Sequence, residues 1–332
     1  MRRTIGAVVV GIVTLAAVSS CANLGRGGGT APSASGNSSF PNHKVVQIVV
    51  GYDAGGFTDV LTRIVAKRMA AELGSEVQVA NVPGAGGSVG LSELAVAHPD
   101  GHTIGTFNVP SALSYIDPAR RLAYHRDSFV PVAGLALSPT VVAVRADAPW
   151  KTFKDLVAAA AADPGSITLA GGTNSTSDDA LTVTALEKDG VDFNVVTIDT
   201  GGADKTTQLL GGQQQVTVGS LGSVQVAVKS GQVRLLAQAT SERSTLLPDV
   251  PTFTELGYDI NTSGSITLAA PAGTPQEYTA VLDAAIKSAL KDPELVKTAN
   301  AAGADIAYIS SDELGKYWKK QEDAAREILG LK

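Results

Sequence analysis

The feature that most constrains the fold is a strand joined to a helix by a glycine-rich turn within residues 45–74. The β-branched apolar run at 45–50 is typical of a buried strand. From Thr58 onward, apolar residues recur at helical spacing, and Gly74 follows as a stop signal. The turn at 51–56 leads directly onto a helix N-terminus, where peptide N–H groups favour an anion. The segment therefore predicts one βα unit with a candidate anion site.

The same order of strand, small-residue turn and helix recurs along the chain. Further strands are predicted at 76–82, 102–109, 140–146, 166–172, 193–199, 216–220 and 233–239, with helices between most of them. Capping boxes at Thr274 and Ser310 begin two helices near the C-terminus. This alternation favours βαβ units with parallel strands, and 332 residues are enough for two domains.

The composition argues against nucleic acid as a partner. The chain has 26 basic and 32 acidic residues, a net charge of −6, and no basic block to neutralise a phosphate backbone. Aromatic residues make up 5% of the chain, too few for a surface on which bases or sugars stack. The 35 glycines suit an α/β protein with many tight turns.

The N-terminus has the pattern of an export signal. Two arginines precede an apolar stretch at 5–18, which is shorter than the about 20 residues of a membrane span. The sequence VSSC at 18–21 resembles a lipobox, so we expect removal of residues 1–20 and acylation of Cys21, the only cysteine. A buried core thiol is the alternative for Cys21, but its place after the apolar stretch favours a lipid anchor. Residues 21–43 are predicted to form a flexible tether, and the export route, Sec or Tat, stays open.

Enzymatic interpretations of the glycine turns find little support. Neither the dinucleotide pattern G-x-G-x-x-G nor the phosphate-loop pattern G-x-x-x-x-G-K-[ST] occurs at these turns. Ser88 lies in a G-x-S-x-G match, the elbow of α/β-hydrolases. That fold needs a histidine late in the chain, whereas the last histidine is His125. Ser88 is therefore interpreted as a helix N-terminal hydroxyl, and a serine hydrolase at Ser88 is kept only as a remote alternative.

Metal ligation and acid–base catalysis are also disfavoured. His98 and His102 have helical spacing, but a proline and a glycine between them predict a turn. Asp178 and Asp179 are predicted in the first turn of a helix, where carboxylates face the positive end of the dipole. The sequence thus predicts no metal, no cofactor and no catalytic residue.

Five turns rich in Gly, Ser, Thr and Asn follow the predicted strands. They are 51–59, 83–88, 108–111, 171–177 and 200–204, with Ser220 as a possible sixth element. Open α/β sheets bind ligands at the carboxyl ends of their strands, so these turns predict a polar cleft. No Arg or Lys lies in the first four turns. A bound carboxylate would therefore be held by peptide N–H groups, hydroxyls, helix dipoles and water.

The chain resembles the Bug receptors, the periplasmic substrate-binding proteins of tripartite tricarboxylate transporters, from about Val46 to Gly330. The resemblance lies in the ordered segments AGGFTDVLTRIVAKRMAAELG, VQVANVPGAGGSVG, AVAHPDGHTIGTFN, RDSFVPVAGLA, LLGGQQQVTVGS, SGQVRLLAQATSERSTLLPDVPTFTELGY and APAGTP. It implies an α/β fold of two lobes, like a periplasmic flytrap, each lobe a mainly parallel sheet flanked by helices. The implied lobes are 44–138 plus 266–332, and 139–265.

The resemblance also implies a function and a site. The protein would be a non-enzymatic, monomeric receptor outside the cytoplasm, anchored through Cys21, that hands a small organic carboxylate to membrane permease subunits. The implied ligand-binding residues are Tyr52, Ala54, Gly55, Gly56, Thr58, Asp59, Asn108, Thr173, Asn174, Ser175, Gly201, Gly202 and Ser220. Asp59 is expected to face the dipole of its helix or, alternatively, to bind a ligand amino group. A ligand-binding sensor for a membrane signalling partner remains an alternative to transport.

Overall fold

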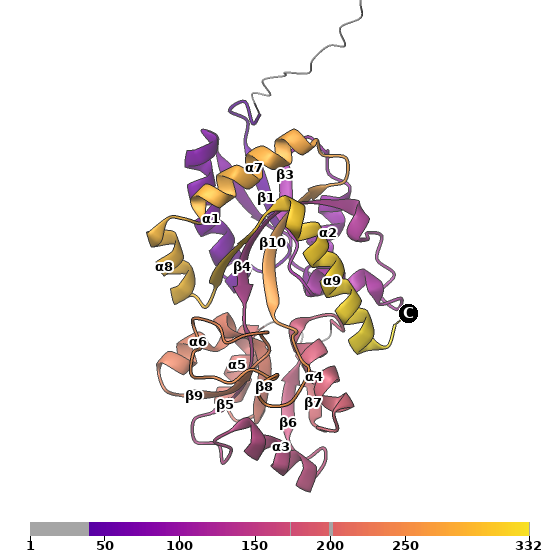
Figure 1. Cartoon of the computed structure of the whole chain (residues 1–332), viewed down its shortest axis with the longest axis vertical. Helices are drawn as coiled ribbons and strands as arrows, with labels where there is room; N and C mark the ends of the chain where they lie inside the picture. Colours follow the sequence, from indigo (N-terminus) through magenta and orange to yellow (C-terminus); the bar gives the residue numbers. More distant parts are fainter. Residues whose placement is uncertain (1–39, 173, 199–201, 332) are drawn as a thin grey trace, which may run out of the picture. The chain divides into compact units, whose positions relative to one another are not determined.

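The opening βα unit has the predicted form (Figure 1). The computed structural model describes residues 40–172, 174–198 and 202–331. Strand β1 spans Val46–Val50, and its inward residues are fully buried. Helix α1 spans Phe57–Leu73 and ends at Gly74, whose left-handed φ of 59° is the usual helix stop.

Six strands form the first sheet, in the order β11-β4-β10-β3-β1-β2. Its other strands are β2 (Val77–Asn81), β3 (Thr103–Thr106), β4 (Phe129–Ser138), β10 (Gly264–Pro271) and β11 (Asp305–Ile309). Strand β1 is parallel to β2 and β3, whereas β10 and β11 run antiparallel to their neighbours. Besides α1, the helices here are α2 (Ser88–Ala95), α7 (Gln276–Ala289), α8 (Pro293–Ala301) and α9 (Ser311–Leu329), with 3₁₀ turns at Ala85–Gly87, Ser111–Ile116 and Arg126–Ser128.

Five strands form the second sheet, in the order β7-β6-β8-β5-β9. They are β5 (Thr140–Arg145), β6 (Thr168–Gly171), β7 (Asn194–Thr197), β8 (Val216–Ser220) and β9 (Val233–Gln238). The accompanying helices are α3 (Phe153–Ala162), α4 (Asp178–Lys188), α5 (Gly202–Leu210) and α6 (Leu221–Lys229). Strand β6 is parallel to β7 and β8, and β5 is antiparallel to β8 and β9.

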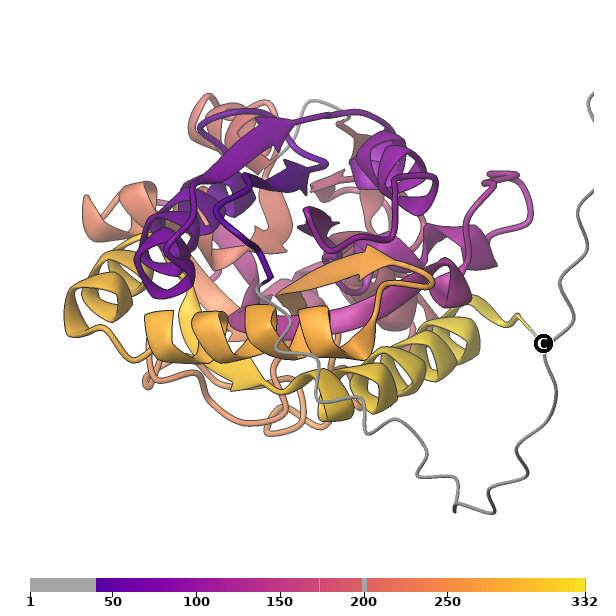
Figure 2. The ribbon, with the colours of Figure 1, turned by 90° about the horizontal axis from the view of Figure 1, so that it is seen from above.

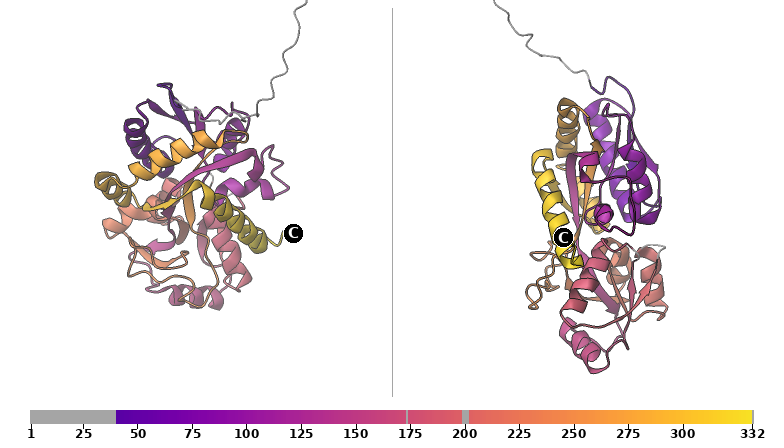
Figure 3. Two further views of the ribbon diagram at one scale, coloured as in Figure 1. Left: turned by 45° about the horizontal axis from the view of Figure 1, so that its top comes forward. Right: turned by 90° about the vertical axis from the view of Figure 1, so that its right-hand side faces the viewer.

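The chain passes between the two sheets twice, at residue 139 and through residues 239–263. We call the six-stranded sheet with its helices lobe 1 and the five-stranded sheet with its helices lobe 2 (Figures 1 and 3). The predicted two-lobed α/β fold is confirmed. The exact residue limits given to the lobes from the sequence stay a prediction.

Both sheets are mixed, which differs from the mainly parallel sheets expected from the alternating pattern. The parallel pairs are β1 with β2 and β3, and β6 with β7 and β8. The predicted strand at 140–146 is β5, and it runs antiparallel. The chain enters lobe 2 at the start of β5, so β5 runs away from the lobe boundary, whereas β6, β7 and β8 run towards it.

The sequence analysis did not identify β4, β10, β11 or α8. Strand β4 contains Pro131 and Gly134, which weaken any strand signal. Strand β11 pairs with β4 only between Gly134 and Leu137, so the missing N–H of Pro131 leaves no gap in that ladder. Helix α8 had a local signal, because Asp292 caps it and Pro293 occupies its first position.

An aromatic cluster holds the end of β3 in place. Trp318 of α9 is 1% exposed and stacks on Phe107, with 4.2 Å between ring centroids. Its indole Nε1 donates to Thr267 Oγ1 at 3.2 Å. Helices α7 and α9 both pack against β4 along one face of the sheet (Figure 2). This packing fixes the residue that follows Phe107, Asn108, at the edge where the site lies.

Candidate functional site

A cavity of about 730 Å³ lies where the parallel strands of both lobes end. Lobe 1 lines it with the β1–α1 turn and with residues 108–111 after β3. Lobe 2 lines it with the first residues of α4, α5 and α6, which follow β6, β7 and β8. Ligand sites of open α/β sheets lie at such carboxyl ends, so the fold places this cavity where a ligand is expected.

The β1–α1 turn brings backbone close to backbone. A Cβ on Gly51 would lie 2.9 Å from the Cα of Gly87, so only glycine fits against the second glycine turn. Gly55 has a φ of 79° and donates its N–H to Asp59 Oδ2 at 2.8 Å. Gly56 is the N-cap of α1 and has no side chain to cap it. The N–H groups of the first turn of α1 are therefore not occupied by a capping side chain at the cavity.

Asp59 stabilises this turn by accepting from the Gly55 N–H, and it does not line the cavity. It is 3% exposed, accepts from Asn81 Nδ2 at 2.9 Å and pairs with Arg63 at 2.9 Å. Burial works to raise the pKa of Asp59, but hydrogen bonds from Arg63, Gly55 and Asn81 together lower it below its usual value. Since its oxygens already have these partners and Asp59 lies outside the lining, its predicted ligand contact stays a prediction.

Asn108 and Thr58 form one polar unit on the lobe 1 wall. Asn108 Nδ2 donates to Thr58 Oγ1 at 2.8 Å, so the Thr58 hydroxyl remains able to donate a hydrogen bond. The Asn108 Oδ1 atom is buried and has no hydrogen-bond partner within the described ranges of the chain. Burial, with a smaller contribution from the charge of Asp178, raises the pKa of Tyr52. Tyr52 is therefore a neutral phenol that can donate to a ligand.

The first turn of α4 forms the facing wall in lobe 2. Ser177 caps the helix by accepting from the Ala180 N–H, and its hydroxyl donates to Asp179. Asp179 is also ion-paired with Lys205 of α5, and the two side chains are 5% and 10% exposed. Asp178 accepts from Thr140 Oγ1 at 2.6 Å. Burial and the neighbouring Asp179 charge raise the pKa of Asp178 to about 6.

Most of the sequence-predicted site residues line this cavity. Those that do are Tyr52, Ala54, Gly55, Gly56, Thr58, Asn108, Asn174, Gly202 and Ser220. Ser175 lies outside the lining, and its hydroxyl donates instead to Asp117 Oδ2 of lobe 1 at 2.7 Å. Thr173, Gly201 and Cys21, with the signal peptide and most of the tether, lie outside the described residues.

The sequence analysis missed several lining residues that carry charge or hydroxyls. Lys205 follows the predicted turn at 200–204 by one residue, and Asp178 was interpreted only as a capping carboxylate. Ser138 ends β4, a strand that was not predicted, so no sequence signal marked it. Lys205 could have been predicted at the site by extending the turn at 200–204 one residue into the helix that follows.

Ser88 is structural. Its residue is 2% exposed, and its Oγ lies 3.0 Å from Ser114 Oγ and 3.2 Å from the Tyr124 hydroxyl. It does not line the cavity, and these hydroxyl partners satisfy it as a helix N-terminal residue. Within the described residues no cluster of His, Cys, Asp and Glu could hold a metal ion. None of the helices in that part of the chain has the length and apolar character of a membrane span.

Contacts between the lobes flank the cavity on two sides. On one side, Asn174 Nδ2 donates to the Ser111 carbonyl at 3.2 Å. On the other, Gln225 Nε2 donates to the Asn300 carbonyl at 3.2 Å. In addition, a Cβ on Gly222 would lie 2.5 Å from the Phe57 ring, so the starts of α6 and α1 are in contact. The cavity is thus bounded by both lobes.

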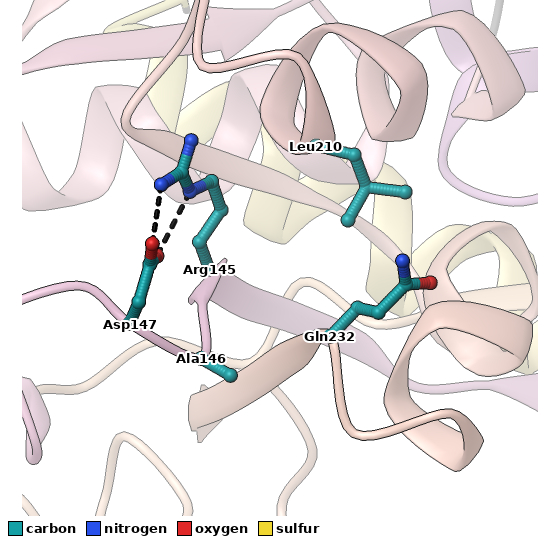
Figure 4. Close-up of a pocket in the computed structure, with 5 residues that line it drawn as sticks. All are labelled: Arg145, Ala146, Asp147, Leu210 and Gln232. Atoms are coloured by element: carbon teal, nitrogen blue, oxygen red, sulfur yellow. Dashed lines mark hydrogen bonds and ion pairs between the residues drawn. The ribbon is translucent and has the colours of Figure 1, made fainter.

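A smaller hollow of about 260 Å³ lies on lobe 2 around Arg145 (Figure 4). Figure 4 shows the Arg145 guanidinium turned to Asp147, with Nε to Oδ1 at 2.9 Å and Nη2 to Oδ2 at 2.5 Å. That pair holds the pKa of Asp147 below its usual value. Among the described residues Arg145 is the one cation that lines this hollow, and Asp147 already neutralises it. The hollow is therefore a weaker candidate for an anion than the cavity between the lobes.

Comparison with known proteins gives one consistent family. A family model described as tripartite tricarboxylate transporter family receptor matches residues 61–330. A protein of Cupriavidus necator, named as a UPF0065 protein in the gbd 5' region, is 32% identical over 88% of this chain and 89% of its own. A solved structure titled as a periplasmic transporter is 30% identical and covers 86% of this chain and 96% of its own, with a TM-score of 0.79. The MatC protein of Rhodopseudomonas palustris, solved with bound malate, is 26% identical, covers 86% and 99% of the chains and has a TM-score of 0.76.

Proposed function

Because this chain belongs to the tripartite tricarboxylate transporter receptor family, a family of solute-binding receptors and not of enzymes, we propose that it captures a small organic carboxylate in the cavity between its lobes. The observation that carries the proposal is the uncapped N-terminus of α1 at the wall of that cavity. Peptide N–H groups and the helix dipole at such an end favour a negative group without any countercharge. The malate bound to MatC agrees in chemical class.

The ligand carboxylate accepts from the backbone of the β1–α1 turn in this proposal. Gly55 and Gly56 keep the turn free of side chains, and Thr58 adds its hydroxyl because Asn108 has already donated to its oxygen. The start of α6 faces the same place, and its N-cap Ser220 makes no capping bond either. Contacts to both lobes then favour a closed arrangement over an open one.

The receptor would deliver its ligand to the membrane subunits of a tripartite permease. The family name supports such a partner, and the lipobox-like sequence before Cys21 supports a lipid anchor outside the cytoplasm. We propose that the receptor acts as a monomer, since one chain supplies both walls of the cavity. A role as a ligand sensor for a membrane signalling protein uses the same site, and loss of uptake on deletion of the receptor would distinguish transport from sensing.

Calorimetric titration with a carboxylate panel tests the proposal. The full chain is titrated with acetate, malate, adipate, citrate and 4-aminobutyrate, and at least one should bind and raise the unfolding midpoint. Thr58→Val should weaken the tightest of these about 10-fold or more, since one hydrogen bond to a charged group contributes about 1.5–3 kcal/mol. Thr62→Val is the matched control, because Thr62 lies on the same helix, donates to the Thr58 carbonyl and does not line the cavity. Binding of none of these compounds would contradict the proposal.

A further inference from the structure

Resting on the proposed function, we propose that the ligand is an amino carboxylate, whose ammonium group binds Asp178 at the lobe 2 wall while its carboxylate binds the start of α1. The proposal rests on the charges that line the cavity, on how the start of α4 is occupied, and on a buried hydroxyl without a partner, that of Ser138, which lines the same cavity as Asp178.

The charged groups that line the cavity do not suit a ligand with two carboxylates. Within the described residues they are three carboxylates and one ammonium, namely Asp53, Asp178, Asp179 and Lys205. Asp53 is exposed at the turn, whereas Asp179 and Lys205 are buried. A dianion would enter a cavity of its own sign, and like charges in a partly desolvated site repel strongly.

Within the described residues, the one cation that lines the cavity already has an anionic partner. Lys205 is ion-paired with Asp179, and Asp179 also accepts from the Ser177 hydroxyl. Breaking this buried pair to free Lys205 for a ligand carboxylate would leave Asp179 uncompensated. The dipole of α4 cannot replace it, because Ser177 caps the helix and two of its own carboxylates occupy the first turn. The α4 wall therefore has no remaining capacity for a ligand anion.

Asp178, in contrast, has capacity for a donor. The Thr140 hydroxyl is the one side chain that donates to it within the described ranges. Two residues before Thr140, Ser138 lines the same cavity, is 5% exposed and has a hydroxyl without any hydrogen-bond partner in that part of the chain. The Asp178 carboxylate and the Ser138 hydroxyl oxygen can both accept hydrogen bonds, and an ammonium group supplies three donors.

The two walls of the cavity thus differ in charge. On lobe 1, the start of α1 has no capping side chain and presents peptide N–H groups, and the start of α6 touches it through Phe57 and Gly222. The Leu221 N–H of α6 already donates to the Pro139 carbonyl at 2.7 Å, so the carboxylate contact is assigned to α1. On lobe 2, Asp178 supplies a carboxylate that lines the same cavity. A molecule with a carboxylate and an ammonium group complements both walls at once.

The titration of Asp178 gives the proposal a pH signature. The groups that face Asp178 are Asp179 on its own helix, Lys205 on α5 and Tyr52 across the cavity. Burial first, and Asp179 second, raise the pKa of Asp178 to about 6. Amino carboxylates keep their own charges between pH 5 and pH 8, so their affinity should rise as pH passes through about 6 and Asp178 becomes charged.

The test compares ligands that differ only in whether a carboxylate or an ammonium stands at the second end. The full chain is titrated calorimetrically at pH 8 with succinate and 3-aminopropanoate, glutarate and 4-aminobutyrate, adipate and 5-aminopentanoate, and methylmalonate and alanine. At least one amino carboxylate should bind 10-fold or more tightly than its dicarboxylate counterpart, as expected of a charge-assisted contact in a partly buried site. Asp178→Asn, which keeps shape and the Thr140 contact, should abolish that preference. Asp189→Asn is the control for a general effect of net charge and should leave the preference within about 2-fold, because Asp189 lies at the other end of α4, is exposed and does not line the cavity.

Each outcome decides one statement. Tighter binding of the dicarboxylate in all four pairs overturns the amino carboxylate assignment and leaves the proposed function intact. Equal loss of preference in both variants overturns the contact with Asp178. Failure of every compound here, and of malate, adipate and citrate, contradicts the proposed function itself. The comparison of amino carboxylates with dicarboxylates uses the unmodified chain. It therefore tests the inference even if Asp178→Asn folds poorly.

Discussion

Helices α1 and α4 begin at the same cavity, on opposite lobes, with opposite chemistry. Helix α1 has Gly56 as its N-cap and no capping side chain, and the one acidic residue of its first turn, Asp59, bonds to the Gly55 N–H and supports the turn. Helix α4 starts at Ser177, which caps it, and carries Asp178 and Asp179 in its first turn. The same backbone geometry is therefore open to an anion on lobe 1 and closed to one on lobe 2.

The largest effect should come from removing the cation that balances the α4 wall. Lys205→Met leaves Asp179 buried without its partner, and breaking such a pair costs about 3 kcal/mol or more of unfolding free energy. Denaturant unfolding measures this loss. Lys319→Met is the matched control, because the Lys319–Asp323 pair is exposed and contributes at most about 1 kcal/mol. A loss as small as that of the control would mean that α4 does not depend on Lys205.

A smaller effect should come from straining the α1 wall. Gly55→Ala places a side chain at a φ of 79°, which costs about 1–2 kcal/mol of unfolding free energy, although the added methyl meets no atom within 4 Å. Gly190→Ala is the control, with a φ of 81° and an equally open surrounding. Both variants should unfold more easily, but only Gly55→Ala should weaken ligand binding. Equal affinities would show that the β1–α1 turn does not touch the ligand.

The smallest effect should come from removing the cap of α4. Ser177→Ala deletes the acceptor of the Ala180 N–H and should cost about 1 kcal/mol of unfolding free energy. Ser310→Ala is the comparison, because Ser310 occupies the N-cap of α9 but makes no capping bond, so its loss should be a few tenths of that value. Thermal unfolding of the two variants measures the difference. Equal shifts would mean that α4 is no better capped than α9.

The contrast between the two helices was only partly predictable from the sequence. The strand-turn-helix units were found because periodicity and glycine turns are local signals. The direction of β5 and the existence of β4 and β11 depend on where the chain enters each lobe, which no local pattern records. For the same reason Ser138, at the end of β4, could not be placed at the site.

Within the site, the sequence predicted the local setting of a residue more reliably than its hydrogen-bond partners in the fold. Asp178 was recognised in a first helical turn, but its position at the cavity and its contact with Thr140 come from an approach of residues 38 apart in the chain. Asp59 was predicted at the ligand, and its partners Gly55 and Arg63 nearby and Asn81 on β2 hold it outside the cavity lining. A sequence gives the charge of each side chain but not which charges are already balanced.

Backbone amide NMR of the full chain, titrated with its tightest-binding carboxylate, tests the central claim most directly. The account predicts that the amide signals of Phe57 and Thr58 shift and saturate together with that of Gly222 at the start of α6. The Ala180 amide, which donates to Ser177, should change little. Largest shifts around Arg145 and Gln232, the hollow of Figure 4, with unchanged signals at Phe57 and Thr58, would contradict it.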